Sequence, residues 1–174
     1  MKLSLKSVAT LSAVSALVVS PLFFAGSASA QPVRFDGSYV GAGVGGSVTQ
    51  GGRGNDESKF GGNIQGRFAV PNAPVSVRGS VLFDGDNSVV IPSLTYDIPV
   101  ANRTNVYVGA GYGFVQNDGR TSQLGNKDAA VISAGVESEV ARGVVVYSDA
   151  KYGINAYEGG AGSVSLVGGV GLRF

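Results

Sequence analysis

The sequence predicts an all-β fold: an eight-stranded antiparallel up-and-down transmembrane β-barrel, preceded by a cleaved signal peptide. Eight consecutive segments alternate along the chain, which is the period of a strand whose neighbouring side chains point to opposite faces. In every segment one face can be chosen that carries no charge. The chain ends on Phe174, so its last strand offers an aromatic ring to a membrane interface and a free carboxylate to water.

Residues 1–30 have the features of a signal peptide. Lys2 and Lys6 form a short positive region, an apolar run follows, and Ala28-Ser29-Ala30 is a small-residue cleavage site. The alternative is a membrane-spanning helix, but the apolar run is short for one and Ser and Thr interrupt it. We therefore expect export by the Sec pathway, cleavage after Ala30 and a barrel domain over residues 31–174.

The eight alternating segments are each about 10 to 12 residues long, which suits a tilted strand that crosses a bilayer. Eight is also an even number, as bacterial barrels require if both chain ends lie on one side of the membrane. Pro92 has no N–H for a strand ladder, so we expect a bulge or a missing bond there. The segments are residues 38–49, 59–70, 75–84, 88–98, 105–116, 129–140, 144–155 and 163–174.

Short and longer connections alternate between these segments, as do the turns and loops at the two rims of such a barrel. The short turns are residues 71–74, 99–104 and 141–143, and the loops are residues 50–58, 85–87, 117–128 and 156–162.

The face assigned to lipid carries no charge when the phase of each strand is chosen to keep charges inward. A charge facing mid-bilayer costs about 2 to 4 kcal/mol, so this pattern is typical of a barrel in a membrane. Aromatic residues also gather toward the ends of this face, as two interfacial girdles do. They are Phe60, Phe83, Phe114 and Tyr152 toward the loop rim, and Phe68, Tyr96 and Phe174 toward the turn rim.

Two motifs resemble known barrel strands. Val170, Leu172 and Phe174 lie on the apolar face of the last segment, which resembles the closing strand of bacterial outer-membrane β-barrels, although Leu172 stands where a second aromatic is common. Tyr39-Val-Gly-Ala-Gly43 recurs as Tyr107-Val-Gly-Ala-Gly111 and resembles strands of the small outer-membrane β-barrel domain family, related in form to OmpX and the OmpA transmembrane domain.

The resemblance implies a location in the outer membrane of a Gram-negative-type cell, surrounded by outer-membrane lipid and lipopolysaccharide. It also implies that the barrel-assembly machinery recognises the C-terminal strand during biogenesis. We expect a monomer, and the extracellular partner stays open.

The inward face carries charges of both signs, and we expect them to form a lumen charge network. If the turn at residues 71–74 pairs Val70 with Val75, Arg67 and Arg78 lie directly opposite each other, which is unfavourable unless carboxylates reach them. Because eight strands enclose just enough room for side chains, we expect a plugged, ion-paired interior. The network comprises Lys59, Arg67, Arg78, Asp97, Glu137, Glu139, Asp149, Lys151 and Arg173. Inward glycines at positions 41, 43, 45, 109, 111 and 113 are expected to let a narrow barrel curve.

The composition argues against several function classes. The chain has 13 Lys and Arg against 12 Asp and Glu, so nothing in its charge favours nucleic-acid binding. It has no His and no Cys, so it lacks the usual general base and cannot form disulfides. We therefore expect neither an enzyme nor a cofactor or metal site.

Three local patterns are candidate exceptions to that expectation. Residues 41–46 satisfy the dinucleotide fingerprint, but no helical pattern follows to hold a pyrophosphate. Ser148 is expected to face lipid, away from Asp149, which prevents an acid–base partnership. Acidic loop residues 56–57, 84 and 86 are candidates for loose divalent-cation binding, although such residues are usually just solvated.

Three functions remain open from the sequence. The first is an integral outer-membrane protein with a structural or surface-interaction role, a plugged lumen, and contact elements in the loops at residues 50–58 and 117–128. The second is a narrow pore for ions or small solutes. The third is a soluble periplasmic barrel that carries a ligand.

Overall fold

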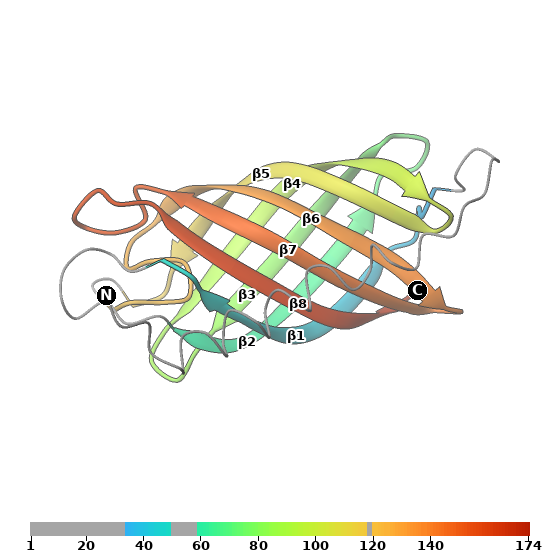
Figure 1. Cartoon of the computed structure of the whole chain (residues 1–174). Helices are drawn as coiled ribbons and strands as arrows, with labels where there is room; N and C mark the ends of the chain where they lie inside the picture. Colours follow the sequence, from blue (N-terminus) through green and yellow to red (C-terminus); the bar gives the residue numbers. More distant parts are fainter. Residues whose placement is uncertain (1–33, 50–58, 118–119) are drawn as a thin grey trace, which may run out of the picture.

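A computed structural model describes residues 34–49, 59–117 and 120–174, which form one closed antiparallel barrel with strands in sequence order (Figure 1). The predicted fold class is therefore confirmed, and each predicted segment coincides with a strand. The predicted signal peptide, residues 1–30, lies outside the described residues. The strands are β1 (Tyr39–Ser47), β2 (Phe60–Ala69), β3 (Val75–Phe83), β4 (Ser88–Ala101), β5 (Thr104–Val115), β6 (Ala129–Ala141), β7 (Val144–Ile154) and β8 (Ser163–Arg173).

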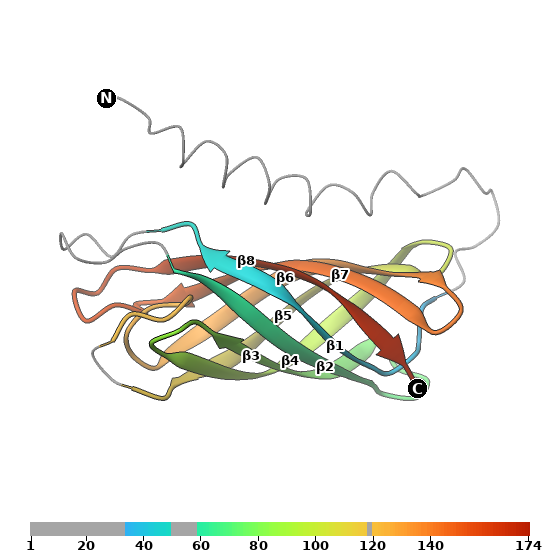
Figure 2. The ribbon, with the colours of Figure 1, turned by 90° about the horizontal axis from the view of Figure 1, so that it is seen from below.

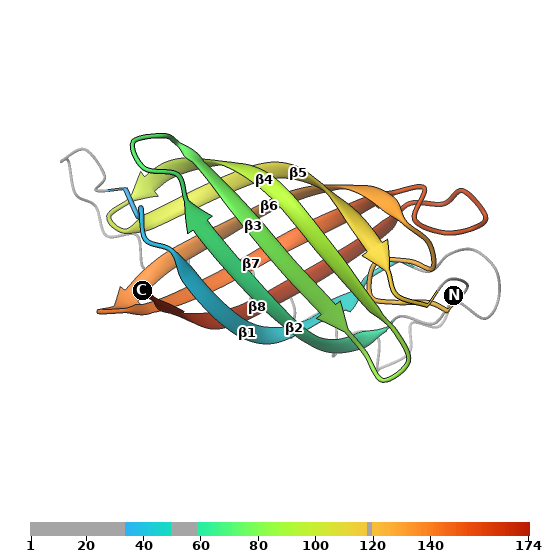
Figure 3. The same ribbon diagram turned by 180° about the vertical axis from the view of Figure 1, so that it is seen from behind.

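The strands run obliquely around the barrel, and β1 closes it by pairing with β8 from Tyr39–Arg173 to Ser47–Ser165 (Figures 2 and 3). The C-terminus lies at the same end as the β6–β7 turn, and the β7–β8 loop lies at the opposite end (Figure 1). We call these ends the turn rim and the loop rim. Among the described residues, no helix is long and apolar enough to cross a membrane.

The turn predicted at residues 99–104 is shorter than expected. β4 continues to Ala101 and β5 begins at Thr104, which leaves Asn102 and Arg103 as the turn. Arg103 has a φ of 55°, in the left-handed region that a tight turn requires. The pairing of β4 with β5 shifts register between Pro99 and Ala101, so the extra residue of a bulge extends the strand past a proline.

Pro92 interrupts one of its two ladders. On one side it pairs with Gly79 of β3. On the other side, Ile91 and Pro92 have no partners on β5: the pairing stops at Val90–Phe114 and resumes at Ser93–Gly111 in the same register. The predicted loss of pairing at Pro92 is therefore present on one side, with no bulge, because the missing N–H removes a ladder bond.

The two faces of the sheet differ as the alternation predicted. Large apolar side chains at the middle of the outer face are about half exposed, and inward polar side chains of the same strands are buried. Val136 and Ser148 keep the outward alternation of their strands, as predicted for Ser148, although they are only 7% and 2% exposed. The exposed set includes Val40, Ile64, Val77, Leu94, Val108, Ile132 and Val170.

Candidate functional site

Four buried charged side chains occupy the lumen and form what we call the central quartet: Arg67, Arg78, Asp97 and Glu137. Arg67 and Arg78 are directly opposed across β2 and β3. The Asp97 carboxylate forms ion pairs with both arginines: its Oδ2 lies 2.7 Å from Nη2 of Arg67, and its Oδ1 lies 3.1 Å from Nη2 of Arg78. Glu137 lies 3.2 Å from Nε of Arg67 and 2.9 Å from Nη1 of Arg78. Each carboxylate therefore bridges both guanidinium groups, which compensates the repulsion between the two arginines.

Neutral donors and acceptors complete the quartet. Nε of Arg67 donates to Oγ of Ser76 at 2.9 Å, and the Ser76 hydroxyl in turn donates to Asp97. On the neighbouring strand pair, Nε of Arg78 donates to Oγ1 of Thr95 at 3.0 Å. All four charged side chains are at most 3% exposed, and charges so far from water are tolerated only with such partners.

Tyrosine rings form a layer beside the quartet. The guanidinium carbon of Arg78 lies 3.7 Å from the centroid of the Tyr107 ring, a cation–π contact. The Tyr107 hydroxyl donates to Asp149 at 2.7 Å, and Asp149 pairs with Lys151 at 2.8 Å. The inward charges Asp149 and Lys151 are thus brought together as a separate pair on β7.

Tyr147 shows why the lumen needs inward glycines. Its ring stacks on Tyr39 with 5.8 Å between centroids. A Cβ at Gly41 would lie 2.7 Å from the Tyr147 ring, and one at Gly169 would lie 2.5 Å from its hydroxyl. Glycine on two neighbouring strands therefore leaves the space that a large inward ring occupies.

Three residues of the predicted network lie at the barrel ends instead. Glu139 and Arg173 pair at 2.9 Å at the turn rim, where Arg103 also approaches Glu139 to 3.8 Å. Lys59 pairs with Asp86 at 2.8 Å at the loop rim. Lys59 precedes the first residue of β2, and Glu139 follows most of β6, so neither reaches the middle of the lumen. The single network predicted from the sequence is divided into four groups.

Phe35, from the lead before β1, fills the turn end of the lumen. It is 1% exposed, and its ring lies 5.0 Å from the guanidinium carbon of Arg67 and 5.7 Å from that of Arg173. Its carbonyl accepts hydrogen bonds from Asn105 Nδ2 at 2.6 Å and from Arg67 Nη2 at 3.3 Å. Sequence reasoning missed this residue because a single aromatic in a short lead belongs to no alternating pattern.

An apolar cluster fills the loop end. Leu124, from the β5–β6 connection, packs there, and Gln123 holds the segment by donating to the carbonyls of Gly62 at 3.0 Å and Phe83 at 2.8 Å. Residues 122–124 are at most 2% exposed, so the expectation that residues 117–128 form a surface contact loop is wrong for this part. The contact loop predicted at residues 50–58 lies outside the described residues. The cluster comprises Leu82, Val89, Ile91, Leu124, Val131 and Val167.

Comparison with known proteins identifies the barrel. A sequence profile of the outer membrane protein beta-barrel domain matches residues 15–174. The chain belongs to this family. Membership indicates the outer membrane as its location. A search of curated proteins gives no match.

Solved structures of outer-membrane barrels share the fold at low sequence identity. Ail, the attachment invasion locus protein of Yersinia pestis, is 19% identical with a TM-score of 0.53, over 80% of this chain and 99% of that chain. Neisserial surface protein A is 15% identical with a TM-score of 0.57, over 79% and 97%. The N-terminal barrel of Pseudomonas aeruginosa OprF is 16% identical with a TM-score of 0.53, over 80% and 98%. At such identities the likeness shows the fold alone.

The outer surface of this outer-membrane barrel carries the aromatic residues predicted for its girdles. Toward the turn rim, Phe68 contacts Phe174 edge-on with 6.1 Å between centroids. Toward the loop rim, Tyr112 lies 5.0 Å from Phe114 and is a further aromatic that the predicted girdle omitted. Val170, Leu172 and Phe174 of the predicted assembly signal are 54%, 65% and 71% exposed on β8 and at its end. Phe60, Phe68, Phe83, Tyr96, Phe114 and Tyr152 are all 41–63% exposed.

The remaining sequence candidates have partners of their own. Among the described residues, no three or more acidic side chains gather in a way that could hold a metal ion. Asp84 accepts the N–H groups of Asp86 and Asn87 at 3.0 Å, which is a turn-forming role. Residues 56–57 lie outside the described part of the chain.

Proposed function

We propose that this outer-membrane barrel has a structural or surface-interaction role, is not an enzyme, and has a plugged lumen. The observation that carries the proposal is the succession of three fillings along the barrel: Phe35 at the turn end, the central quartet with its tyrosine layer, and the apolar cluster around Leu124 at the loop end. A hydrated path would have to pass all three.

Two of these fillings oppose water for different physical reasons. The apolar cluster offers no polar partners, and water needs two to four of them to occupy a cavity. In the quartet, opening would separate buried charges from their partners, and breaking such a pair costs about 3–5 kcal/mol. These costs support a plug over a permanently open channel.

The proposal includes the biogenesis of the barrel. The chain is exported by the Sec pathway, its C-terminal strand is read by the barrel-assembly machinery, and the mature protein is a monomer in outer-membrane lipid and lipopolysaccharide. Descriptions of structural neighbours as an attachment invasion locus protein and a surface protein support the surface role. The exposed apolar belt argues against the soluble carrier, and a mature protein that stayed in solution without detergent would restore that alternative.

Planar-bilayer recording on the refolded mature protein tests the plug. We expect no discrete conductance steps after the barrel has inserted into the bilayer. Protection of the barrel from protease verifies the insertion. The alternative is a narrow pore for ions or small solutes, favoured by the charges that line the lumen. Discrete steps that disappear when Arg78 is neutralised would establish the pore and contradict the plug.

The assembly signal is tested at the last residue. Replacing Phe174 with Ala is expected to lower the fraction of barrel that reaches the outer membrane in folded form several-fold, because the interfacial ring is lost. Phe174→Tyr keeps a ring and is the matched control. The measurement is the heat-modifiable band in outer-membrane fractions, and equal fractions for the Ala variant and the unchanged protein would refute the assignment.

A further inference from the structure

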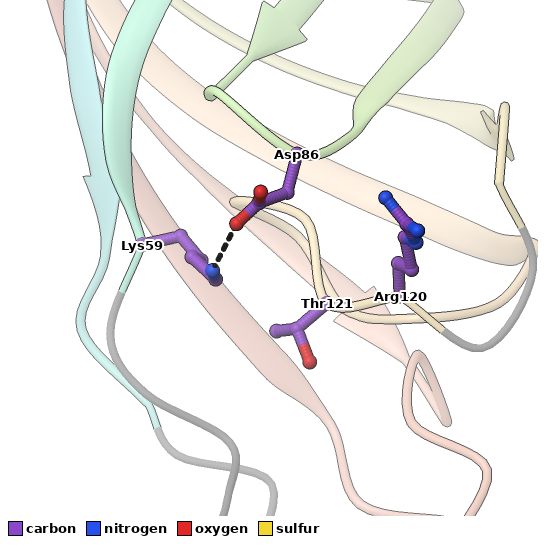
Figure 4. Close-up of a pocket in the computed structure, with 4 residues that line it drawn as sticks. All are labelled: Lys59, Asp86, Arg120 and Thr121. Carbon is purple, nitrogen blue, oxygen red and sulfur yellow. Dashed lines mark hydrogen bonds and ion pairs between the residues drawn. The ribbon is translucent and has the colours of Figure 1, made fainter.

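A polar depression of about 380 Å³ opens at the loop rim (Figure 4). It is lined by Lys59 beside β2, Asp86 in the β3–β4 turn, and Arg120 and Thr121 in the β5–β6 connection. Figure 4 shows Lys59 and Asp86 joined on one side, with Arg120 and Thr121 on the other. Side chains from three separate connections therefore share one hollow.

The backbone around this depression is held in place by Asn87. Its Nδ2 donates to the carbonyls of Asn117 at 3.0 Å and Arg120 at 2.6 Å. Its Oδ1 accepts the N–H of Asn117 at 3.1 Å. The side chain is 5% exposed, so a buried amide ties the strand-side wall of the depression to the connection that carries Arg120. The site is thus pre-organised, which lowers the entropic cost of binding.

The lining favours a hydrophilic anion. Among the described residues that line the depression, two are cations and one is a carboxylate, and none is aromatic or apolar. A guanidinium group matches the tetrahedral oxygens of phosphate and sulfate better than an ammonium group does, and a hydroxyl adds a further donor. The volume lies in the range of small-molecule sites, near its lower end.

We propose that Lys59, Arg120 and Thr121 bind a phosphate or sulfate ester carried by a saccharide. This inference rests on the proposed function, because only a surface barrel exposes the loop rim to saccharides outside the cell. Asp86 positions Lys59 through their 2.8 Å ion pair and repels the bound ester. Phosphate esters occur on the lipopolysaccharide around the barrel, and sulfate esters would come from a glycan of another cell.

The test is an NMR titration of the refolded mature protein in detergent micelles with glucose 6-phosphate, glucose 6-sulfate and glucose. We expect the amide signals of Asp86, Asn87 and Arg120 to shift with one or both esters, with a dissociation constant on the order of millimolar, and not with glucose. The ester that binds more tightly identifies the source. Lack of binding by both esters, or equal binding by glucose, would overturn the proposal and leave the bilayer test of the plug untouched.

Three variants sharpen this test. Arg120→Ala is expected to weaken ester binding about tenfold or more, as the loss of a charge-assisted hydrogen bond would. Arg142→Ala removes another exposed arginine, at the turn rim, and should leave binding unchanged. Asp86→Asn should tighten binding several-fold, because the amide oxygen can still accept the hydrogen bond that positions Lys59 while the competing negative charge is removed. Unchanged binding in Arg120→Ala, or weaker binding in Asp86→Asn, would refute the assigned roles, with heat-modifiable migration confirming that each variant folds.

The pH dependence of binding distinguishes titration of the bound ester from titration of the residues that line the site. The hydrogen bond and charge of Lys59, with the charge of Arg120, lower the pKa of Asp86 below its usual range. Asp86 therefore stays ionised between about pH 5 and pH 8, where the chain has no His to titrate. Sulfate-ester binding should be flat over that range, whereas phosphate-ester binding should strengthen as pH rises through about 6, where the phosphate gains its second charge. A sulfate-ester affinity that changed across the same range would contradict this picture.

Discussion

Replacing Asp97 with Ala is expected to destabilise the barrel by about 3–5 kcal/mol, the usual cost of removing one partner from a buried ion pair. Asp97 contacts both arginines of the central quartet at 2.7 and 3.1 Å and accepts the Ser76 hydroxyl. Without it, Arg67 and Arg78 stay opposed across β2 and β3 with Glu137 as the one remaining carboxylate of the quartet. The lumen would then hold an uncompensated positive charge.

Equilibrium unfolding by urea in lipid vesicles measures this effect. The matched control is Glu158→Ala, which removes an exposed carboxylate from the β7–β8 loop and should change the free energy of unfolding by less than about 0.5 kcal/mol. If Asp97→Ala changed the free energy of unfolding no more than the control does, the quartet would contribute little to stability. The ion pairs of the quartet could then not be what holds the lumen closed.

Replacing Ile64 with Arg is expected to cost about 2–4 kcal/mol, because it places a charge against mid-bilayer hydrocarbon. Ile64 lies at the middle of β2, is 48% exposed, and pairs with Ala42 and Val81 on neighbouring strands. Its neighbours on the outer face are thus small or apolar, and neither of these two can compensate a guanidinium group.

Val70→Arg is the control, one residue beyond the end of the same strand and in the same outward alternation. Val70 directly follows β2 at the turn rim and is 38% exposed. A charge near the interface costs only about 0–1 kcal/mol, so the difference between the two variants reports depth in the membrane. Equal unfolding free energies of the two variants in vesicles would show that Ile64 does not face hydrocarbon. The assignment of the lipid-facing and lumen-facing sides of the sheet would then be wrong.

The strands could be predicted from the sequence because alternation is a local signal. Each strand exposes one face to lipid and one to the lumen, so the period of two repeats in all eight segments. The opposition of Arg67 and Arg78 also followed from local information, since the Pro71 turn sets the register of β2 against β3. Neither prediction needed knowledge of residues far apart in the chain.

The fillings at the two ends could not be predicted in the same way. Phe35 and Leu124 lie outside the strands. Phe35 is held by Asn105, and Leu124 is held through its neighbour Gln123, which donates to Gly62, so both positions depend on partners that are distant in sequence. The apolar inward residues near the loop rim, such as Leu82 and Val89, alternate with outward residues that are apolar too. At those strand ends the pattern does not distinguish the lumen from lipid.

The pairing of β1 with β8 has a consequence for folding kinetics. The residues that meet there, such as Tyr39 and Arg173, come from the opposite ends of the domain, so closure carries a large loop-closure entropy and a high contact order. A nascent chain that lacks its final segment would have two unpaired edges, and such edges recruit other strands. The seam is therefore where a truncated chain is most exposed to aggregation, and closing it is the step that a folding catalyst would accelerate most.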